Sequence, residues 1–361
     1  MEAINLIYQT ISASDLPAKQ VDEFVSFAQH DNFFQLAAVK AVRLETLREK
    51  FTGRPLSKVF LSANLAAFEC QLLGYKVEIL EKNFFVESDS LLRQTKIQQL
   101  QNAVVIVNNN DVGAIEARAG YAEFFRECDS TYFVAWDWDN HHWLDLSTFL
   151  AAHSDIYCPA HHENLYILSR FNWLTAGPVY CSSVQWSRRF LTEHLDAILL
   201  AQRSPSPLGM HIPYAKFNFR MQVVTAVNQH YSSVGFSNRT FHERSALDKL
   251  QEWCAHTCHW IAPVLNDVPI RIFDALITGG IPIVPESLRL VLPVRDIPRN
   301  HVVFYNPADI IQPQGGVAKA NALFDHGGRD GIVARHRYAL EKHHGNASVM
   351  QMLGFVAELM R

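Results

Sequence analysis

The segment of this chain best equipped for chemistry is Phe133 to Trp143, whose sequence is FVAWDWDNHHW. An apolar run ends there in two carboxylates, Asp137 and Asp139, which an amide and two imidazoles follow. Carboxylates and imidazoles act as general acids and bases, and a carboxylate can also be a nucleophile. The three tryptophans of the segment offer flat faces on which a sugar ring can stack. We therefore predict catalysis at this strand end. The alternative is a loop whose Asp and Asn cap the next helix and whose tryptophans are core residues.

A second segment, residues 268–286, predicts an amphipathic helix that ends at Gly279 and Gly280 and leads into a short apolar strand. Glycine lets the chain reverse there without a Cβ clash, and it also admits close approach of a ligand to the backbone. Ligands of α/β proteins bind where strands end and helices begin, so Glu286 and Ser287 are candidates to bind ligand hydroxyl groups. For Gly279 the alternative is an ordinary helix C-cap.

The same segment has the pattern R-x-x-D-A-L-x-x-G-G-x-P, which begins at Arg271 and includes Asp274. It resembles the donor-binding segment of GT-B glycosyltransferases, whose usual form is close to R-x-x-E-A-x-x-x-G-x-P. The resemblance implies that Arg271 contacts a phosphate or an acidic sugar and that Asp274 binds a ribose hydroxyl. The chain departs from the family at Asp274, where glutamate is usual, and at Asn266, where an acidic residue is common. A surface ion pair between Arg271 and Asp274 is the alternative.

Lys216, Arg220 and Arg239 are further cations that could neutralise a leaving phosphate when no metal is present. Arg239 follows a predicted strand at the place where GT-B enzymes often have a phosphate-binding loop. We therefore expect Lys216 and Arg239 to join the donor site. For each cation the alternative is a solvated surface charge.

The spacing of Asp137 and Asp139 also matches the D-x-D of GT-A glycosyltransferases, in which two carboxylates hold a divalent cation on the donor diphosphate. GT-A enzymes have one continuous domain without a segment like 268–286, and that segment is longer and more specific than D-x-D. We therefore expect Asp137 or Asp139 to act as base or nucleophile without a metal, with His141 and His142 as alternative bases. A metal-dependent GT-A-like enzyme is the first alternative, and a non-catalytic nucleotide- or sugar-binding protein is the second.

A looser resemblance is to the bacterial Kdo transferases of capsule and lipopolysaccharide assembly, which are similar in size, cytoplasmic placement and acidic strand end. Those enzymes use a CMP-activated acidic sugar, and Arg271, Lys216 or Arg239 would suit such a donor. The implied activity is transfer of a sugar from a nucleotide sugar, CMP-Kdo-like or a nucleoside-diphosphate sugar, to a hydroxyl of a glycan or glycolipid in bacterial surface glycan synthesis. No cofactor is implied.

Short apolar, β-branched runs alternate with helix-length segments in two series, which predicts parallel sheets covered by helices. The first series is Lys58–Ser62, Lys76–Leu80, Ala103–Val107, Thr131–Ala135 and Asp155–Cys158. The second is Val179–Val184, Tyr231–Phe236, His259–Leu265, Ile281–Val284 and His301–Tyr305.

The expected fold is α/β, with two Rossmann-like domains facing across a cleft in the GT-B manner and a helical N-terminal segment over residues 1 to 52. The expected domains are residues 1–178 on the acceptor side and 179–345 for the nucleotide sugar. A terminal helix over 346–361 packs back on the first domain, as the resemblance implies.

Composition and charge bound the remaining possibilities. The chain has 361 residues, enough for two domains, and 48% of them are hydrophobic, which indicates well-packed cores. A formal net charge of -4 gives no basic surface for a polyanion, so we exclude nucleic acid as a partner. The N-terminus has no signal-peptide pattern and the chain has no run of eighteen apolar residues. We therefore expect a cytoplasmic protein, and peripheral contact with a membrane stays open.

Overall fold

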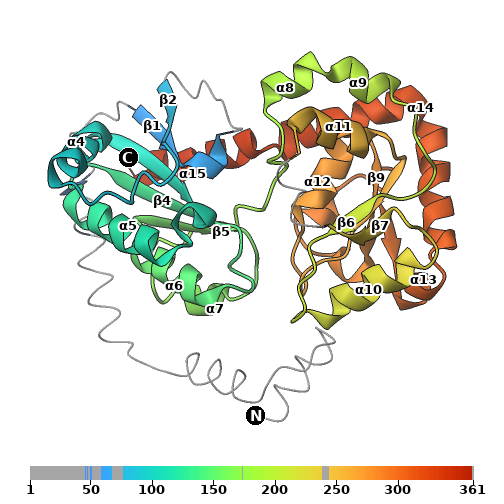
Figure 1. The fold of residues 1–361 in the computed structure, drawn as a ribbon, viewed down its shortest axis with the longest axis horizontal. Coiled ribbons are helices and arrows are strands. Elements are labelled where there is room, and N and C mark those ends of the chain that lie inside the picture. The colour runs from blue at the N-terminus through green and yellow to red at the C-terminus, as the bar shows by residue number, and fades with distance from the viewer. Residues whose placement is uncertain are drawn as a thin grey trace, which may run out of the picture. The chain divides into compact units, whose positions relative to one another are not determined.

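The computed structural model describes residues 58–66, 76–172, 174–237 and 244–359, together with the helical positions 45, 47, 49 and 50. The remainder of the predicted N-terminal helical segment lies outside the described residues. The chain forms two compact units (Figure 1). The N-terminal unit comprises the described residues up to 181 and residues 345–359, and the C-terminal unit comprises residues 182–344.

The N-terminal unit is built on a five-stranded parallel sheet in the order β2-β1-β3-β4-β5. Its strands are β1 (Lys58–Leu61), β2 (Lys76–Ile79), β3 (Ala103–Asn108), β4 (Tyr132–Asp137) and β5 (Ile156–Pro159). All five lie where the first series predicts them. Strands β3, β4 and β5 are buried at every residue, as expected for a parallel sheet covered on both faces.

Helices surround this sheet in Figure 1. They are α4 (Ser90–Leu100), α5 (Ile115–Glu127), α6 (Leu144–Ala152), α7 (Leu165–Leu168) and α15 (Gly345–Leu359), with the 3-10 turns η1 (Ala63–Leu65) and η2 (Asn109–Val112). The core beneath them is rich in aromatic side chains, and Tyr121, Phe124 and Phe133 are fully buried within it.

The described part of the C-terminal unit contains five more parallel strands. They are β6 (Gly209–His211), β7 (Val234–Phe236), β8 (Cys258–Trp260), β9 (Ile281–Pro285) and β10 (Val303–Tyr305). The ladder β8-β9-β10 and the pair β6-β7 adjoin, because Leu208 at the start of β6 forms a parallel bridge with His259 of β8. The spatial order is therefore β7-β6-β8-β9-β10.

The helices of this unit are α8 (Arg188–Glu193), α9 (Leu195–Leu200), α10 (Asn218–Asn228), α11 (Ala246–Cys254), α12 (Ile270–Ile277), α13 (Pro307–Ile311) and α14 (Gln314–Lys342), with the 3-10 turns η4 (Glu286–Leu288) and η5 (Val294–Asp296). Two apolar clusters pack against the strands. Ile283 belongs to the cluster that includes α10, whereas the next residue, Val284, belongs to the cluster that includes α12. Side chains alternate in direction along a strand, so the sheet is covered on both faces.

One strand of the second series was predicted wrongly. Val179–Val184 is not a strand, although Ser183 forms an isolated bridge with His344. The first strand of the unit is β6 instead, which has only three residues and includes a glycine and a histidine, so it has no apolar signature. The expected helix, glycine pair and strand of residues 268–286 are confirmed as α12, Gly279-Gly280 and β9.

Both units share one strand order. Numbered within each unit, the strands run 2-1-3-4-5, so the chain reverses direction across the sheet between its first and third strands. Ligands of such sheets bind outside the carboxyl ends of the strands, next to this switch point. The switch points are β1/β3 and β6/β8.

Candidate functional site

Polar side chains gather at the carboxyl edge of the N-terminal sheet. They come from the end of β3 (Asn108 and Asn109), from the end of β4 (Asp137 to His142) and from the loop after β5 (His161). The strands are parallel, so their carboxyl ends meet at one edge and side chains distant in sequence become neighbours. The predicted catalytic segment does lie at such an edge.

Asp137 points into the protein. Its side chain is 1% exposed, one carboxylate oxygen accepts from the Tyr157 hydroxyl at 2.6 Å, and the other accepts from the Asp139 backbone N–H at 3.0 Å. Burial raises the pKa of this carboxyl to about 6, against hydrogen bonds that lower it. The structure thus assigns Asp137 to holding the loop in place. It does not bring Asp137 to the surface beside Asp139, as the D-x-D alternative requires.

Asp139 is the more accessible carboxylate. Its Oδ2 accepts from Asn109 Nδ2 at 2.7 Å, while its Oδ1 lies 3.9 Å from His142 Nδ1. Asn109 is itself fixed, because its Oδ1 accepts from the Trp138 backbone N–H at 3.0 Å. A half-buried carboxylate held by one amide and facing one imidazole can accept a proton or bind a cation.

Three histidines pack together beside Asp139. His142 Nδ1 lies 2.9 Å from His141 Nε2, and the ring centroids of His141 and His161 are 4.3 Å apart. His161 is buried, and burial lowers its pKa to about 4, so its imidazole is neutral at physiological pH. His161 Nε2 lies 2.9 Å from the Trp138 carbonyl oxygen, which can only accept, so Nε2 carries the hydrogen. The lone pair is then on Nδ1.

Asn140 closes this loop against the one after β5. Its Oδ1 accepts from the His161 backbone N–H at 2.9 Å, and its Nδ2 donates to the His161 and Glu163 carbonyls at 3.0 and 2.8 Å. Asn140 is fully buried. Asn140 therefore has a structural role, as the alternative to a catalytic strand end predicted. It differs from that alternative in one respect, because Asn140 binds a loop and does not cap the next helix.

The tryptophans do not form a common wall for a sugar ring. Trp136 is fully buried and donates from Nε1 to the Val179 carbonyl at 2.8 Å, so it is a core residue. Trp138 packs edge-on against Trp136 and is half-buried. The Arg118 guanidinium lies over the Trp143 ring at 5.9 Å.

In the C-terminal unit, two guanidinium groups lie at the β6/β8 switch point. Arg220 from α10 donates from Nε to the Pro263 carbonyl at 3.3 Å, just after β8, and Arg271 comes from the first turn of α12. Burial and the charge of Arg220 lower the pKa of Arg271 to about 10. His211, at the end of β6, has its pKa lowered well below the usual value by burial and then by both arginines. His211 Nε2 accepts from the Ala262 N–H at 3.0 Å, which joins the two strand ends.

Asp274 does not lie free beside Arg271. It is 1% exposed, and its two oxygens accept from Ser183 Oγ at 2.7 Å and Gln185 Nε2 at 2.6 Å. Burial raises its pKa to about 6 despite these bonds and the charge of Arg271. Both oxygens are engaged inside the protein, so the structure assigns Asp274 to anchoring the segment before α8. The ribose contact inferred from the resemblance has no support here.

Gly279 and Gly280 lie at the opposite end of α12 from Arg271. They precede β9, which places them at the amino edge of the sheet, away from the edge that binds ligands. A Cβ on Gly279 (φ +79°) would come within 2.4 Å of Ile332, and one on Gly280 within 2.5 Å of His259 Nε2. The glycine pair therefore serves packing, and we remove it from the donor site.

The remaining residues of the predicted donor site are Glu286, Ser287, Lys216 and Arg239. Glu286 and Ser287 are exposed at the carboxyl end of β9, the edge that Arg271 also occupies, and Glu286 pairs with Arg289 at 2.7 Å. Lys216 is exposed on the segment between β6 and α10, with its Nζ 5.1 Å from the Phe217 ring centroid. Arg239 lies outside the described residues.

Asn109 and His211 lie at these two edges and were not predicted. Arg220, a candidate cation in the sequence, was left out of the predicted donor site, and His161 was left out of the predicted catalytic site. Asn109 belongs to a run of three asparagines that directly follows an apolar strand, so the rule that ligands bind at strand ends could have found it. Arg220 could be separated from other cations only by its burial, at 7% exposure.

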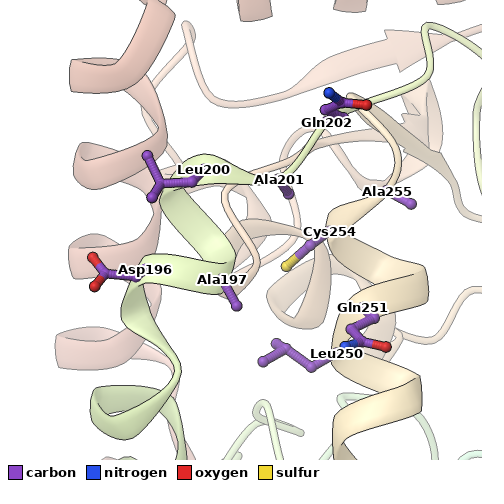
Figure 2. Close-up of a pocket in the computed structure, with 9 residues that line it drawn as sticks. All are labelled: Asp196, Ala197, Leu200, Ala201, Gln202, Leu250, Gln251, Cys254 and Ala255. Atoms are coloured by element: carbon purple, nitrogen blue, oxygen red, sulfur yellow. The ribbon is translucent and has the colours of Figure 1, made fainter.

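A pocket of about 480 Å³ lies elsewhere in the C-terminal unit, between α9 and α11 (Figure 2). Its lining is mostly apolar and includes Leu200, Leu250 and Cys254, whose sulfur points toward the gap between the helices. None of the predicted site residues lines it.

No protein-family model and no curated protein sequence matches this chain. Among solved structures, the α,α-trehalose 6-phosphate synthase of Burkholderia multivorans is 10% identical, with a TM-score of 0.42 over 76% of this chain and 74% of that chain. The catalytic domain of starch synthase IV from Arabidopsis thaliana, bound to ADP and acarbose, is 10% identical, with a TM-score of 0.40 over 75% and 76% of the two chains.

A search of the described residues for a helix long and apolar enough to cross a membrane finds none.

Proposed function

We propose that this chain is a GT-B-type glycosyltransferase whose C-terminal unit binds an activated nucleotide sugar. The observation that supports this most is the pair Arg220 and Arg271 beside the β6/β8 switch point. Burial, and after it the nearby charge of Arg220, lowers the pKa of Arg271, so withdrawal from water and like-charge repulsion both disfavour its charged form. An anionic ligand between or beside them would relieve that repulsion.

A nucleotide sugar supplies such an anion. Guanidinium groups bind phosphate oxygens through paired, charge-assisted hydrogen bonds, and the positive end of α12 adds to the attraction. As the sugar departs, negative charge grows on the leaving phosphate, and fixed cations stabilise that charge without a metal. Glu286 and Ser287, at the end of β9, are proposed to bind hydroxyl groups of the donor.

Asp139 is the proposed base on the acceptor side, with His142 as the alternative. Either group would deprotonate the acceptor hydroxyl in an inverting displacement. In a retaining double displacement, Asp139 would instead attack the anomeric carbon. Asp137 enters this proposal through its hydrogen bond to the Asp139 N–H, as the residue that positions the loop.

The finer assignment rests on the sequence resemblance. The donor is proposed to be a CMP-Kdo-like or nucleoside-diphosphate sugar, and the acceptor a glycan or glycolipid of the bacterial surface, reached through peripheral contact with a membrane. Arg271 suits the carboxylate of an acidic sugar as well as a phosphate. A non-catalytic sugar- or nucleotide-binding protein is the competing function, and for it the replacement of Asp139 would leave function intact.

A thermal-shift panel of CMP, UDP, GDP and ADP tests the donor site. One nucleotide is expected to raise the melting temperature, because a ligand at a hundred times its dissociation constant adds about 2.7 kcal/mol of stability. Arg271→Gln and Arg220→Gln are expected to abolish the shift. Arg295→Gln is the matched control, since Arg295 is an exposed arginine of the same unit that pairs with Asp296. If none of the four nucleotides stabilises the protein, the proposed function is wrong.

A further inference from the structure

The side chains of Asp139, His141 and His142 converge on one point at the carboxyl edge of the N-terminal sheet. One ligand atom from each lies within 4.8 Å of the other two. His142 Nδ1 is 2.9 Å from His141 Nε2 and 3.9 Å from Asp139 Oδ1. Ligand atoms of a tetrahedral ion with bonds of about 2.0 to 2.1 Å lie about 3.3 Å apart, between these two distances.

The carboxylate of this trio is oriented in advance. Asn109 Nδ2 holds Asp139 Oδ2 at 2.7 Å, which leaves Oδ1 directed at His142. The backbone N–H of Asp139 is bound in turn by Asp137 at 3.0 Å. Metal ligands in proteins are oriented by partners of this kind, and losing such a partner lowers metal affinity.

His161 adds an independent observation. Its side chain is 3% exposed, its Nε2–H donates to Trp138, and its Nδ1 has no hydrogen-bond partner among the described residues. A buried ring nitrogen with a lone pair and no partner is costly unless a ligand uses it. His161 packs against His141 with ring centroids 4.3 Å apart, so this unsatisfied nitrogen adjoins the cluster, although His161 is not one of its three ligands.

The chemistry of these donors selects the ion. Mg²⁺ and Ca²⁺ prefer oxygen ligands and would find one carboxylate here, whereas two imidazoles and a carboxylate suit Zn²⁺, Co²⁺, Ni²⁺ or Fe²⁺. A route for the ion exists, because the side chains of Asp139 and His142 are 26% and 15% exposed.

We propose that Asp139, His141 and His142 form a mononuclear site for a divalent transition-metal ion. The sequence did not predict this site, and it differs from a D-x-D site, in which Asp137 would be a ligand. With an ion bound, Asp139 and His142 are occupied as ligands and do not serve as the base proposed above. The two proposals are therefore tested separately, this one by metal binding and the proposed sugar transfer by nucleotide binding.

Titration with Co²⁺ and Zn²⁺ tests the site. The full chain, treated with a chelator and dialysed, is titrated with Co²⁺ while its visible d–d absorption is recorded, and with Zn²⁺ in a calorimeter. One ion per chain is expected. The cobalt spectrum should have no sulfur-to-metal charge-transfer band, because the ligands are nitrogen and oxygen.

Substitutions locate the ion. Asp139→Asn and His142→Gln are expected to weaken binding on the order of tenfold or more, and Asn109→Ala to weaken it while keeping one ion per chain. His162→Gln is the matched control, because His162 lies on the same edge but is exposed and contacts Tyr180 at 3.1 Å. Circular dichroism confirms that each variant is folded. The proposal is overturned if the wild-type chain binds no ion, if a thiolate band appears, or if Asp139→Asn and His142→Gln bind like the control.

Discussion

Asp137 and Asp139 are two residues apart in sequence, yet their carboxylates have opposite environments. The Asp137 carboxylate is buried and accepts a hydrogen bond from Tyr157 of β5. The Asp139 carboxylate lies at the edge of the sheet and accepts one from Asn109, which follows β3. Either partner is more than fifteen positions away in sequence, so the D-x-D pattern by itself could not assign the roles. The rule that strand ends gather at one edge did place the segment correctly.

At the residue scale, the buried carboxyl group of Asp274 is expected to make the stability of the protein depend on pH. Its folded-state pKa is raised from 3.8 to about 6, so the folded protein holds its proton more tightly than the unfolded chain does. The resulting stability is complete below about pH 4 and is lost as the pH rises through 6. Relative to Asp274→Asn, which cannot ionise, the wild-type free energy of unfolding should fall over this range by on the order of 3 kcal/mol.

Urea denaturation of both proteins at several pH values between 4 and 7 measures this difference. Asp274→Ala should be the less stable variant at every pH, because it leaves Ser183 and Gln185 without their buried acceptor. If the wild-type free energy of unfolding, minus that of Asp274→Asn, stays constant or rises with pH, the assigned pKa is wrong.

At the scale of elements, α12 and β9 were predictable because their signals are local. A helical apolar stripe, a glycine pair and a short apolar run suffice to place helix, turn and strand. The role of the glycines was not predictable, since Ile332 and His259, which fill the space around them, come from α14 and β8. β6 was missed because a three-residue strand has too few side chains to form a pattern. Val179–Val184, which was predicted as a strand, forms an isolated bridge at Ser183 instead.

Glycine substitutions test the packing role. Gly279→Ala is expected to lower the free energy of unfolding by about 2 to 3 kcal/mol, because its Cβ would overlap Ile332 and its φ is positive. Gly315→Ala is the control. It is an exposed helical glycine of α14 with no atom within 4 Å of the added Cβ, so it should be neutral or stabilising by up to about 1 kcal/mol.

Denaturant unfolding measures both variants. In the fraction of Gly279→Ala that is folded, nucleotide affinity should equal that of the wild type. A loss of nucleotide binding without a loss of stability would return the glycine to the donor site.

At the scale of the whole molecule, the last helix belongs with the first unit. α15 follows α14 directly in sequence, but its residues group with the N-terminal unit, beside which it lies in Figure 1. Val349, Met352, Leu353 and Val356 are buried. Burial of each such side chain contributes about 1.5 to 3 kcal/mol, so α15 is expected to be essential to the stability of that unit.

Truncation after His344 tests this assignment. The shortened chain should be cleaved rapidly by a protease within residues 76–181, while cleavage within 182–344 stays as slow as in the full chain. Limited proteolysis followed by mass spectrometry maps the sites. Faster cleavage confined to residues 182–344 would show that α15 supports the other unit.

The amino-acid sequence by itself determined the α/β class, the alternation of strands and helices, and the strand end where carboxylates and imidazoles gather. These features follow from patterns within a few residues, because periodic burial of a strand or helix shows directly in the order of its side chains. Only the tertiary structure decided that Asp137 and Asp274 are buried, that Arg220 joins Arg271 at a switch point, and that Asn109 aims Asp139 at His142. Burial and charge of a polar group are set by neighbours from other elements, and a linear pattern does not contain those neighbours.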